Sequence, residues 1–215
     1  MARLGMVIDT GRCVGCDACT LACKMQNGTP PGVLLSKVLE KEEGSYPQVK
    51  RTYLPVLCFH CDDPPCVKAC PSNALSKRPD GIVEVDKDRC CGVKACMAAC
   101  PYDALHFYEN HEGYFGENLT PIERYYYARH RPGTILKCDF CSERLKRGIS
   151  PACIEACPVS CRYFGDLEDS QSQVSQLVKK GARPVLPEAG ILNLPGMAAF
   201  GGGLLLTILG ILFAL

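Results

Sequence analysis

Short apolar runs alternate with groups of cysteines between residues 5 and 170 of the sequence. The apolar runs predict three strands, at Gly5–Ile8, Gly81–Val85 and Arg162–Phe164. Small and apolar residues near the ends of the cysteine groups predict short helices, at Ala18–Lys24, Val67–Cys70, Ala95–Cys100 and Ile154–Cys157. We therefore expect an α+β fold that repeats a unit of strand, cysteine loop and short helix.

The pattern changes completely at the end of the chain. Residues 197–215 carry no charged side chain, and Thr207 is their single polar side chain. A helix of this length spans about 28 Å, which is close to the thickness of the bilayer core. A helix in a soluble core would present a polar face, which this segment lacks. We expect a C-terminal transmembrane helix here, with a buried segment docked on a partner protein as the alternative.

Composition and charge argue against several classes of function. The net charge is +1, Trp is absent, and Lys and Arg are scattered, so no nucleic-acid-binding surface is expected. No glycine-rich phosphate loop follows a strand, and no pair of nucleophile and base is recognisable. A ferredoxin-like reductase that is an enzyme in its own right remains an alternative, and it would require an organic cofactor site that the sequence does not reveal.

The 17 cysteines carry the main chemical signal. Cys161 stands alone, and the others fall into four groups: Cys13, Cys16, Cys19 and Cys23; Cys58, Cys61, Cys66 and Cys70; Cys90, Cys91, Cys96 and Cys100; and Cys138, Cys141, Cys153 and Cys157. Disulfide frameworks favour secreted chains with a signal peptide, whereas Met1–Thr10 holds no long apolar stretch. The tight grouping also favours metal ligation over disulfides.

The spacing of the cysteines distinguishes between metals. Cys-x2-Cys-x2-Cys-x3-Cys in the first group matches the bacterial ferredoxin spacing, in which the fourth thiolate reaches a neighbouring cluster. Zinc sites use two separated pairs, often with His. The four groups therefore indicate iron–sulfur clusters, with a structural zinc protein as the alternative.

The cysteine groups and their flanking residues resemble a known family. The matching text is VIDTGRCVGCDACTLACK, CFHCDDPPCVKACP, CMAACPYDAL, KCDFCSERLKRG and ACIEACPVSCRYFGDL, which covers roughly residues 5 to 170. It is similar to the iron–sulfur (beta) subunit of the molybdopterin oxidoreductases. These include dimethyl sulfoxide, nitrate, polysulfide, tetrathionate and arsenate reductases and formate dehydrogenase. The membrane tail matches only some members.

The resemblance implies four clusters, each bound by three cysteines of one group and one cysteine of another. The first cluster would take Cys13, Cys16 and Cys19 with Cys157, and the second Cys138, Cys141 and Cys153 with Cys23. The third would take Cys58, Cys61 and Cys66 with Cys100, and the fourth the rest of the third group with Cys70. Three would be 4Fe-4S clusters, and the fourth either 3Fe-4S or 4Fe-4S.

The third group departs from the regular spacing. A regular group would place a cysteine at position 93, which is Val93, and the additional cysteine is Cys91. In the nitrate reductase type the corresponding position is also not cysteine, so the resemblance implies a three-iron cluster held by Cys90, Cys96 and Cys70. Ligation by Cys91 is an alternative that requires a distorted loop, for which Gly92 supplies some freedom. A non-cysteine ligand such as water or Asp88 is the third alternative.

The resemblance also implies two interleaved ferredoxin-like double-cluster modules. Residues 1–50 and 133–170 would form the first module, and 51–109 the second. We expect an insertion loop at 110–132, a linker at 171–196 and the membrane segment at 197–215. Three further expectations concern single side chains: Cys161 as a small buried residue, His60 as a neighbour of the ligands or an exposed side chain, and Arg144, Lys146 and Arg147 as a solvated basic face.

The implied function is electron transfer by a non-catalytic subunit. The resemblance implies that single electrons pass through the four clusters, between a molybdopterin catalytic subunit and an integral membrane subunit linked to quinone or cytochrome. Lys179, Lys180 and Arg183 precede the membrane segment and would favour the cytoplasmic face. Export of the folded chain together with a partner that bears a twin-arginine signal, which the resemblance implies, favours the outer (periplasmic) face. We expect the cluster domain on that outer face, anchored in membrane lipid through 197–215.

Overall fold

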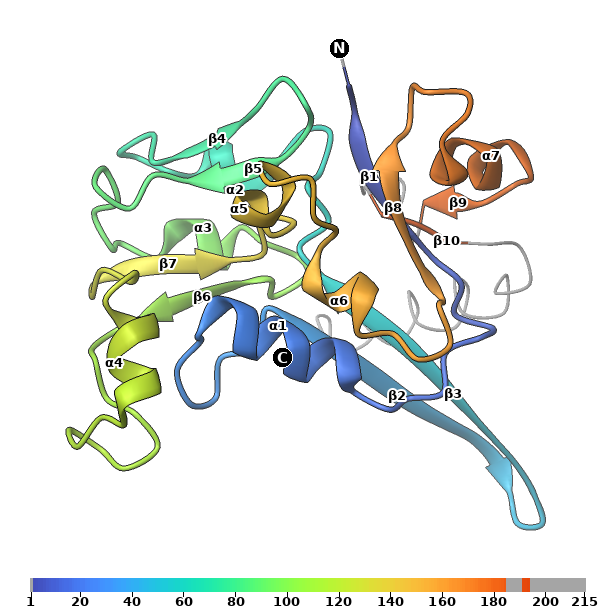
Figure 1. Cartoon of the computed structure of the whole chain (residues 1–215), viewed down its shortest axis with the longest axis horizontal. Helices are drawn as coiled ribbons and strands as arrows, with labels where there is room; N and C mark the ends of the chain where they lie inside the picture. The colour runs from blue at the N-terminus through green and yellow to red at the C-terminus, as the bar shows by residue number, and fades with distance from the viewer. Residues whose placement is uncertain (1, 185–190, 194–215) are drawn as a thin grey trace.

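The computed structural model describes residues 2–184 and 191–193 of the chain (Figure 1). No helix of this described part is both long enough and apolar enough to cross a membrane. The predicted membrane segment, residues 197–215, lies outside the described residues.

Helices and strands are mixed along the described chain, as the α+β expectation predicted. The helices are α1 (Ala18–Asn27), α2 (Pro65–Lys68), α3 (Ala95–Ala98), α4 (Pro121–Tyr127), α5 (Ser142–Leu145), α6 (Ala152–Glu155) and α7 (Gln173–Lys179). The strands are β1 (Leu4–Ile8), β2 (Ser36–Ser45), β3 (Gln48–Leu57), β4 (Leu75–Lys77), β5 (Val83–Val85), β6 (Leu105–Tyr108), β7 (Thr134–Lys137), β8 (Arg162–Asp166), β9 (Arg183–Pro184) and β10 (Ile191–Asn193). The predicted strands correspond to β1, β5 and β8, and the predicted helices to α1, α2, α3 and α6 with shifted ends.

The four-stranded sheet joins the two ends of the described chain. Its order is β8-β1-β10-β9, with β1 antiparallel to β8 and parallel to β10. The side chains of β1 are buried on both faces, because Val7 packs with Val174 of helix α7 while Met6 and Ile8 face the main core. This pairing brings the segment that enters the first cysteine group beside the segment that leaves the fourth.

Two antiparallel pairs of strands support the second and third cysteine groups. Strand β4 pairs with β5, and β6 pairs with β7. One side chain from each strand enters a common buried cluster: Leu75, Val83, Leu105 and Ile135. The one-turn helices α2 and α3 also lie against each other. These contacts hold the second and third groups together, as the four-stranded sheet does for the first and fourth.

The same turn follows three of the cysteine groups. After each Cys-Pro pair, one residue adopts a positive φ: Asn73 (50°), Asp103 (49°) and Ser160 (47°). Asn and Asp tolerate this left-handed conformation better than most side chains do. The next residue is Ala74, Ala104 or Cys161, each of which is buried. The chain then enters β4, β6 or β8 directly.

The long hairpin of β2 and β3 is a feature that the sequence analysis did not predict. Its register runs from Ser36 opposite Leu57 to Ser45 opposite Gln48. Its base is buried at Ser36 and Leu57, whereas Tyr46 at the tip is 93% exposed. Figure 1 shows the hairpin extending well beyond the rest of the fold. Charged residues occupy half of the strand positions in its outer half, so the apolar alternation that identifies a strand is missing there.

Residues 110–132, which we expected to form a loop, contain helix α4, so that expectation is corrected. Thr120 is the N-cap: its hydroxyl accepts a hydrogen bond from the Glu123 N–H at 3.3 Å. The Glu123 carboxylate in turn accepts one from the Thr120 N–H at 2.8 Å. This capping box, with Pro121 in the first turn, starts the helix. The expected linker likewise contains helix α7, which packs on the four-stranded sheet.

Cysteines make up a large part of the buried core. The main apolar cluster combines residues such as Met6, Leu57 and Phe140 with five buried cysteines: Cys19, Cys23, Cys58, Cys138 and Cys153. A second cluster includes Cys66 and Cys96. Sulfur-bearing side chains therefore occupy positions that larger apolar residues fill in most domains.

Candidate metal centres

The first hollow lies beside the start of helix α1. Four predicted ligands line it: Cys13, Cys16, Cys19 and Cys157. Cys161 and Arg162 line the same space, which measures about 290 Å³ out to its open mouth. Groups one and four, which lie far apart in the sequence, thus meet at one site.

The loop that carries the first three of these cysteines is shaped by positive φ angles. Gly15 (67°) and Asp17 (55°) curl the chain before helix α1. A Cβ at Gly15 would lie 2.3 Å from the Tyr53 ring, so the position requires glycine for space as well as for conformation. Asp17 then accepts a hydrogen bond from the Thr20 hydroxyl at 2.9 Å. These contacts fix the loop at the first turn of the helix.

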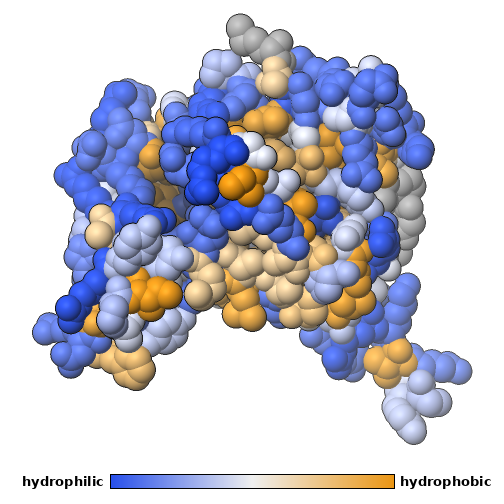
Figure 2. Space-filling model, viewed as in Figure 1, coloured by the Kyte–Doolittle hydropathy of each residue, from blue (hydrophilic) through white to orange (hydrophobic). Residues whose placement is uncertain are grey.

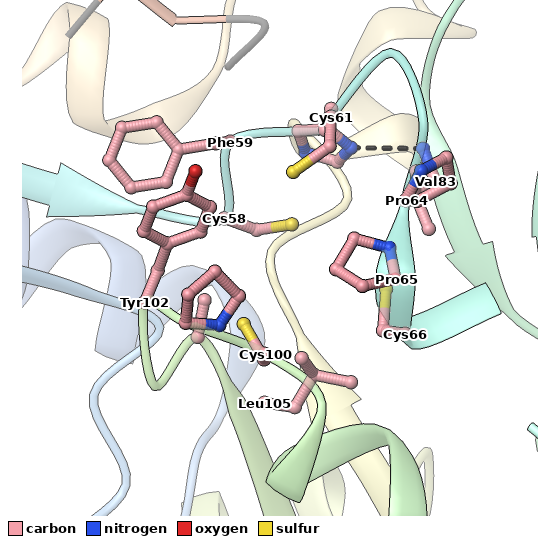
Figure 3. A pocket seen from close by; sticks show the side chains of 13 residues that line it. Cys58, Phe59, Cys61, Pro64, Pro65, Cys66, Val83, Cys100, Tyr102 and Leu105 are labelled. Carbon is pink, nitrogen blue, oxygen red and sulfur yellow. Dashed lines mark hydrogen bonds between the residues drawn. The ribbon is translucent and has the colours of Figure 1, made fainter. Parts of the chain in front are cut away.

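The second hollow is formed by the second group and the end of the third. Cys58, Cys61, Cys66 and Cys100 line a space of about 320 Å³, and Figure 3 shows their side chains around it. Burial, together with negative charge on Cys58, raises the pKa of the Cys66 thiol to about 12. Unlike the first hollow, this one is walled by an aromatic pair, Phe59 and Tyr102, whose ring centroids are 4.3 Å apart.

The four cysteines of the predicted second set also lie near one another. Helix α1 packs against α6, which brings Cys23 beside Cys153. Burial, together with the neighbouring Cys153 and Cys141, raises the pKa of Cys23 to about 12. Burial and the charge of Cys23 also raise the pKa of Cys138. Cys23, Cys138, Cys141 and Cys153 therefore lie within electrostatic reach of one another.

The fourth set brings the second group's last cysteine to the third group. Burial raises the pKa of Cys96, and negative charge on Cys70 and Cys90 raises it further. Cys91 is exposed, and its thiol lies close to Ser72 and Cys70. Hydrogen bonds from the Val93 N–H and from Ser72 lower the pKa of Cys91. Cys91 is thus at the edge of this set.

The loop of the third group repeats the backbone of the first. Gly92 (φ 69°) corresponds to Gly15, and Lys94 (φ 63°) corresponds to Asp17. Val93 therefore occupies the position that Cys16 has in the first group, and it is 59% exposed. The loop is regular, and a single side chain without a ligand atom distinguishes it.

The four sets are contiguous. Cys19 of the first set is near enough to Cys153 of the second to raise its pKa, after the larger effect of burial. Cys58 of the third set acts in the same way on Cys138 of the second. Cys66 of the third set shares a packed cluster with Cys96 of the fourth. The order in space is therefore first, second, third, fourth.

Main-chain N–H groups donate to several of these sulfur atoms. The distances to Sγ are 3.3 Å for Ala74 N to Cys70, 3.4 Å for Phe140 N to Cys138, and 3.4 Å for Cys161 N to Cys157. Such donors favour the thiolate, which is the form that binds metal, whereas burial favours the protonated thiol. A soft metal cation that takes the place of the thiol protons reconciles these effects, because the sulfur is then a thiolate whose negative charge is compensated.

The shape of the sites also bears on the kind of group that fits. Among the described residues, no three His, Cys, Asp or Glu side chains are grouped closely enough to hold a single metal ion. At two of the sets the sulfur atoms line a hollow instead. The donor chemistry and this spread of the sulfurs fit a cluster of several metal atoms.

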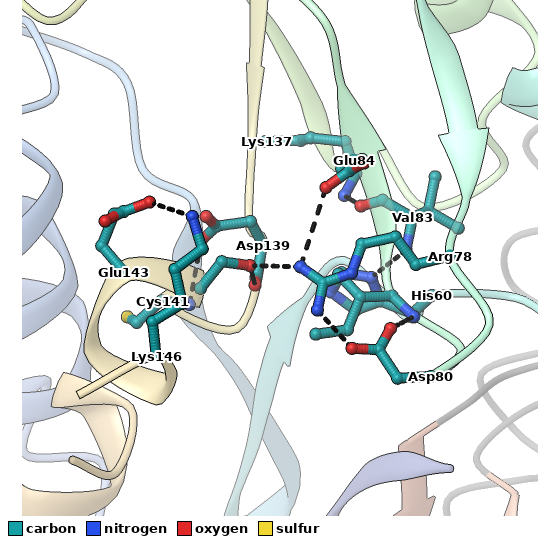
Figure 4. Close-up of polar contacts among 12 residues, drawn as sticks. His60, Arg78, Asp80, Val83, Glu84, Lys137, Asp139, Cys141, Glu143 and Lys146 are labelled. Carbon is teal, nitrogen blue, oxygen red and sulfur yellow. Dashed lines mark hydrogen bonds and ion pairs between the residues drawn. The ribbon is translucent and has the colours of Figure 1, made fainter. Parts of the chain in front are cut away.

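His60 is buried at 3% exposure, which removes the expectation that it is exposed. Its Nδ1 accepts a hydrogen bond from the Val83 N–H at 2.9 Å (Figure 4). The centroids of the His60 and Phe140 rings are 3.9 Å apart. Burial lowers the pKa of His60 well below its ordinary value, and the charge of Lys137 lowers it further. A neutral imidazole therefore lies between the ligand positions Cys58 and Cys61.

The expected basic face is solvated only in part. Lys146 is exposed and pairs with Glu143 at 2.6 Å (Figure 4). Arg144 is mostly covered: it forms an ion pair with Glu155 and donates to Gln26 of helix α1 at 3.2 Å. Arg144 therefore connects helix α5 to both α1 and α6.

The sequence analysis missed two buried cations. The Lys137 ammonium donates to the main-chain oxygens of Val83 and of Cys138, the latter at 2.6 Å. The Arg162 guanidinium donates to Cys19 Sγ at 3.1 Å. A signal was present, because both lie in strands directly beside a cysteine: Lys137 precedes Cys138, and Arg162 follows Cys161.

Comparison with known proteins decides the family. Residues 49–116 and 118–167 match the 4Fe-4S dicluster domain family. The chain is 43% identical to the arsenate respiratory reductase iron-sulfur subunit ArrB of Shewanella sp. (strain ANA-3), over 87% of this chain and 92% of that protein. The chain belongs to the iron–sulfur subunits of the molybdopterin oxidoreductases.

Two further relatives extend the range of this family. A selenate reductase subunit of Mesobacillus selenatarsenatis is 39% identical, over 80% of this chain and 63% of that protein. A tetrathionate reductase subunit of Salmonella typhimurium is also 39% identical, over 82% and 63%. The role of this iron–sulfur subunit is electron transfer. Its described cysteine groups two to four fall within the matched dicluster domain, and the first group precedes it.

Helix α1 of this iron–sulfur subunit presents apolar side chains to the surface. Helix α1 turns Cys19 and Cys23 toward the core and exposes Leu21 (63%) and Met25 (57%). Figure 2 shows apolar surface over the position of this helix. The exposed apolar residues therefore lie directly over the first and second cysteine sets.

Proposed function

We propose that the chain carries four iron–sulfur clusters and connects a molybdopterin catalytic subunit to a membrane subunit. The observation that carries this proposal is the contiguity of the four cysteine sets, in the order first, second, third, fourth. Each set draws cysteines from two groups, which is the pairing that the family resemblance implies. The chain itself is non-catalytic in this proposal, so the chemistry on the substrate resides in another subunit.

The ligands in this proposal are fifteen of the cysteines. The first cluster takes Cys13, Cys16, Cys19 and Cys157; the second Cys23, Cys138, Cys141 and Cys153; the third Cys58, Cys61, Cys66 and Cys100; and the fourth Cys70, Cys90 and Cys96. When bound, these clusters supply one-electron redox chemistry. The protein's own contribution is to hold the thiolates, to donate N–H groups to them, and to keep water away by burial.

We propose a 3Fe-4S cluster at the fourth site. The regular backbone of the loop supports this, because it gives the missing corner to Val93, which has no ligand atom. Cys91 corresponds in this repeat to Val14, which lines the rim of the first hollow. The proximity of Cys91 to Ser72 and Cys70 therefore suits a rim position as well as it suits a ligand.

The exposed apolar residues support the proposal of partner subunits. Relatives carry names of reductase subunits, so an assembly of several chains is the expected setting. Leu21 and Met25 lie over the first and second sets, where a partner that exchanges electrons would have to approach closely. Residues 110–132 offer another contact surface, because they expose the aromatic side chains of Tyr114, Phe115 and Tyr125.

We propose that residues 197–215 anchor the chain in the membrane with the clusters on the outer face. The uncharged length of the segment supports the anchor. Protease treatment of intact spheroplasts should release the soluble part without lysis, and full protection would contradict the outer location. Deletion of residues 197–215 should reduce the membrane-bound fraction. If that fraction is unchanged, a partner alone provides the anchor.

Iron analysis tests the proposal as a whole. Anaerobically prepared protein should contain roughly fourteen to sixteen irons per chain, since each cluster holds three or four. Cys66→Ser should lose about four of these irons, with the other clusters retained. A wild-type value of about eight irons would contradict the four-cluster proposal.

A further inference from the structure

Arg162 is a buried cation between two cysteine sets. It is 3% exposed and opens strand β8, paired with Ile8 of β1. Its Nη2 donates to Cys19 Sγ of the first set at 3.1 Å and to the Ser36 hydroxyl at 3.4 Å. Burial raises the pKa of Cys153 in the second set, and the nearby charge of Arg162 opposes that rise. One guanidinium therefore hydrogen-bonds to a predicted ligand of the first set and lies near a predicted ligand of the second.

The same guanidinium keeps unused donor capacity. Its Nη1 is buried and has no hydrogen-bond partner among the described residues. Arg162 lines the first hollow together with Cys13, Cys16 and Cys157. Buried guanidinium donors are normally all satisfied, so an unpaired one beside a hollow indicates a ligand that accepts hydrogen bonds there.

The charge of Arg162 also lacks an ordinary partner. Among the described residues, no carboxylate lies within ion-pair distance of it. A buried charge without a counter-charge is strongly unfavourable. The groups that surround it are cysteines, chiefly Cys153, Cys19 and Cys161. Negative charge on the two cysteine sets is therefore what compensates Arg162.

We propose that Arg162 is a shared counter-ion for the first and second clusters and makes both of them easier to reduce. This inference rests on the proposed ligand sets. Each added electron increases the negative charge of a set, and a fixed cation close to the ligand thiolates favours that change. Because one cation serves both sets, it also weakens the repulsion between two reduced neighbours. Arg162 is a positioning residue, since it acts through the ligand thiolates.

Redox titration of the purified complex, followed by electron paramagnetic resonance, tests the proposal. Arg162→Gln removes the charge, and Arg162→Lys keeps the charge while losing the forked donors. Arg12→Gln is the matched control, because Arg12 directly precedes Cys13 but is exposed to solvent, where its charge is screened. Iron content is measured for every variant, so that assembly and potential are read separately.

In Arg162→Gln the reduction equilibria of two clusters should each become about tenfold less favourable, which equals about 59 mV for a one-electron couple. The other two clusters should keep their wild-type potentials. All four clusters should also keep them in Arg12→Gln. In Arg162→Lys the potentials of the first and second clusters should shift less than in Arg162→Gln. Full iron content with unchanged potentials in Arg162→Gln would overturn the proposal, and so would equal shifts in Arg162→Gln and Arg162→Lys.

If Arg162→Gln does not assemble its clusters, Arg162→Lys decides. Assembly of the lysine variant with small shifts supports a requirement for the charge. Equal loss of iron in both variants overturns it, because the shape of the arginine would then be what matters. A wild-type protein without iron would instead contradict the proposed function, and the wild-type iron content distinguishes that failure from the others.

Discussion

The sulfur atoms of Cys157 and Cys161 lie 3.5 Å apart, and the Cys161 N–H donates to Cys157 Sγ at 3.4 Å. Cys161 also lines the first hollow beside the predicted ligands. In the repeated turn, however, it holds the position that Ala74 and Ala104 hold after the second and third groups. Cys161 is therefore a hydrogen-bond partner of Cys157, at a place where a small side chain suffices.

Replacing Cys161 should leave the metal content unchanged. Cys161→Ala keeps the main-chain N–H that donates to Cys157 and removes only a buried sulfur, at a cost of about 1 kcal/mol of folding free energy. Cys157→Ala, as the comparison, should lose about a quarter of the iron because one cluster loses a ligand. Iron and sulfide analysis of both variants provides the measurement. Equal losses in the two variants would make Cys161 a ligand.

The parts of this fold that surround the cysteines could be predicted from the sequence, and the parts that support them could not. Strands β1, β5 and β8 contain apolar runs long enough to show their periodicity. The β2–β3 hairpin could not be predicted because residues 40–43 place charges on both faces of β2, and only the base of the hairpin is buried. The role of Arg162 could not be predicted because it depends on Cys19 and Cys153, which the fold brings near it from distant segments.

The fourth site should gain an iron when its loop is made regular. Val93→Cys places a thiol where the first group has Cys16, on a backbone that already has the required φ angles at Gly92 and Lys94. The three-iron signal near g = 2.0 of the oxidised protein, an expectation from general cluster chemistry, should be lost, and a four-iron signal should appear on reduction. Cys91→Ser should leave the wild-type signal intact. Cluster loss in Cys91→Ser, with no oxidised signal in the wild type, would make Cys91 the ligand instead.

Mild acid should weaken the contact between helix α1 and the segment after α4. His130 Nε2 lies 2.8 Å from Asn27 O and 3.1 Å from Gly28 O, so it carries the proton, while Nδ1 faces the Lys87 ammonium at 3.3 Å. Burial lowers the pKa of His130, and the charge of Lys87 lowers it further. The stability that the neutral ring provides is therefore present above its ordinary pKa of about 6.5 and declines as the pH falls below that value.

His130→Gln tests this pH dependence, because glutamine can donate to the same oxygens without titrating. The melting temperature of the wild type should fall between about pH 7.5 and about pH 5.5 by more than that of the variant. Some loss should remain in the variant, since burial also lowers the pKa values of His60 and His106. An identical decrease in both proteins would assign the acid sensitivity to other groups.

Gly92 should be among the least tolerant glycines of the fold. It has a φ of 69°, and an added Cβ would lie 2.6 Å from the main-chain oxygen of Gly133. Gly116 has nearly the same φ, 67°, with no atom within 4 Å of an added Cβ. Both alanine variants carry the left-handed penalty of about 1–2 kcal/mol. Gly92→Ala should lose considerably more stability, together with iron from the fourth site. Equal melting temperatures for the two variants would show that the Gly133 contact is unimportant.

The shared hollow of Cys13 and Cys157 has a consequence for biosynthesis. A ribosome has to deliver nearly all of the described chain before this site has its full set of thiols. The hollow of Cys58, Cys61, Cys66 and Cys100, by contrast, is complete once the middle of the chain has emerged. The middle of the protein is therefore ready for iron delivery first, and the pairing of β1 with β8 closes the N-terminal sites as a late event. A nascent chain stalled before Cys157 would present Cys13, Cys16 and Cys19 as unpaired thiols to the quality-control machinery of the cell.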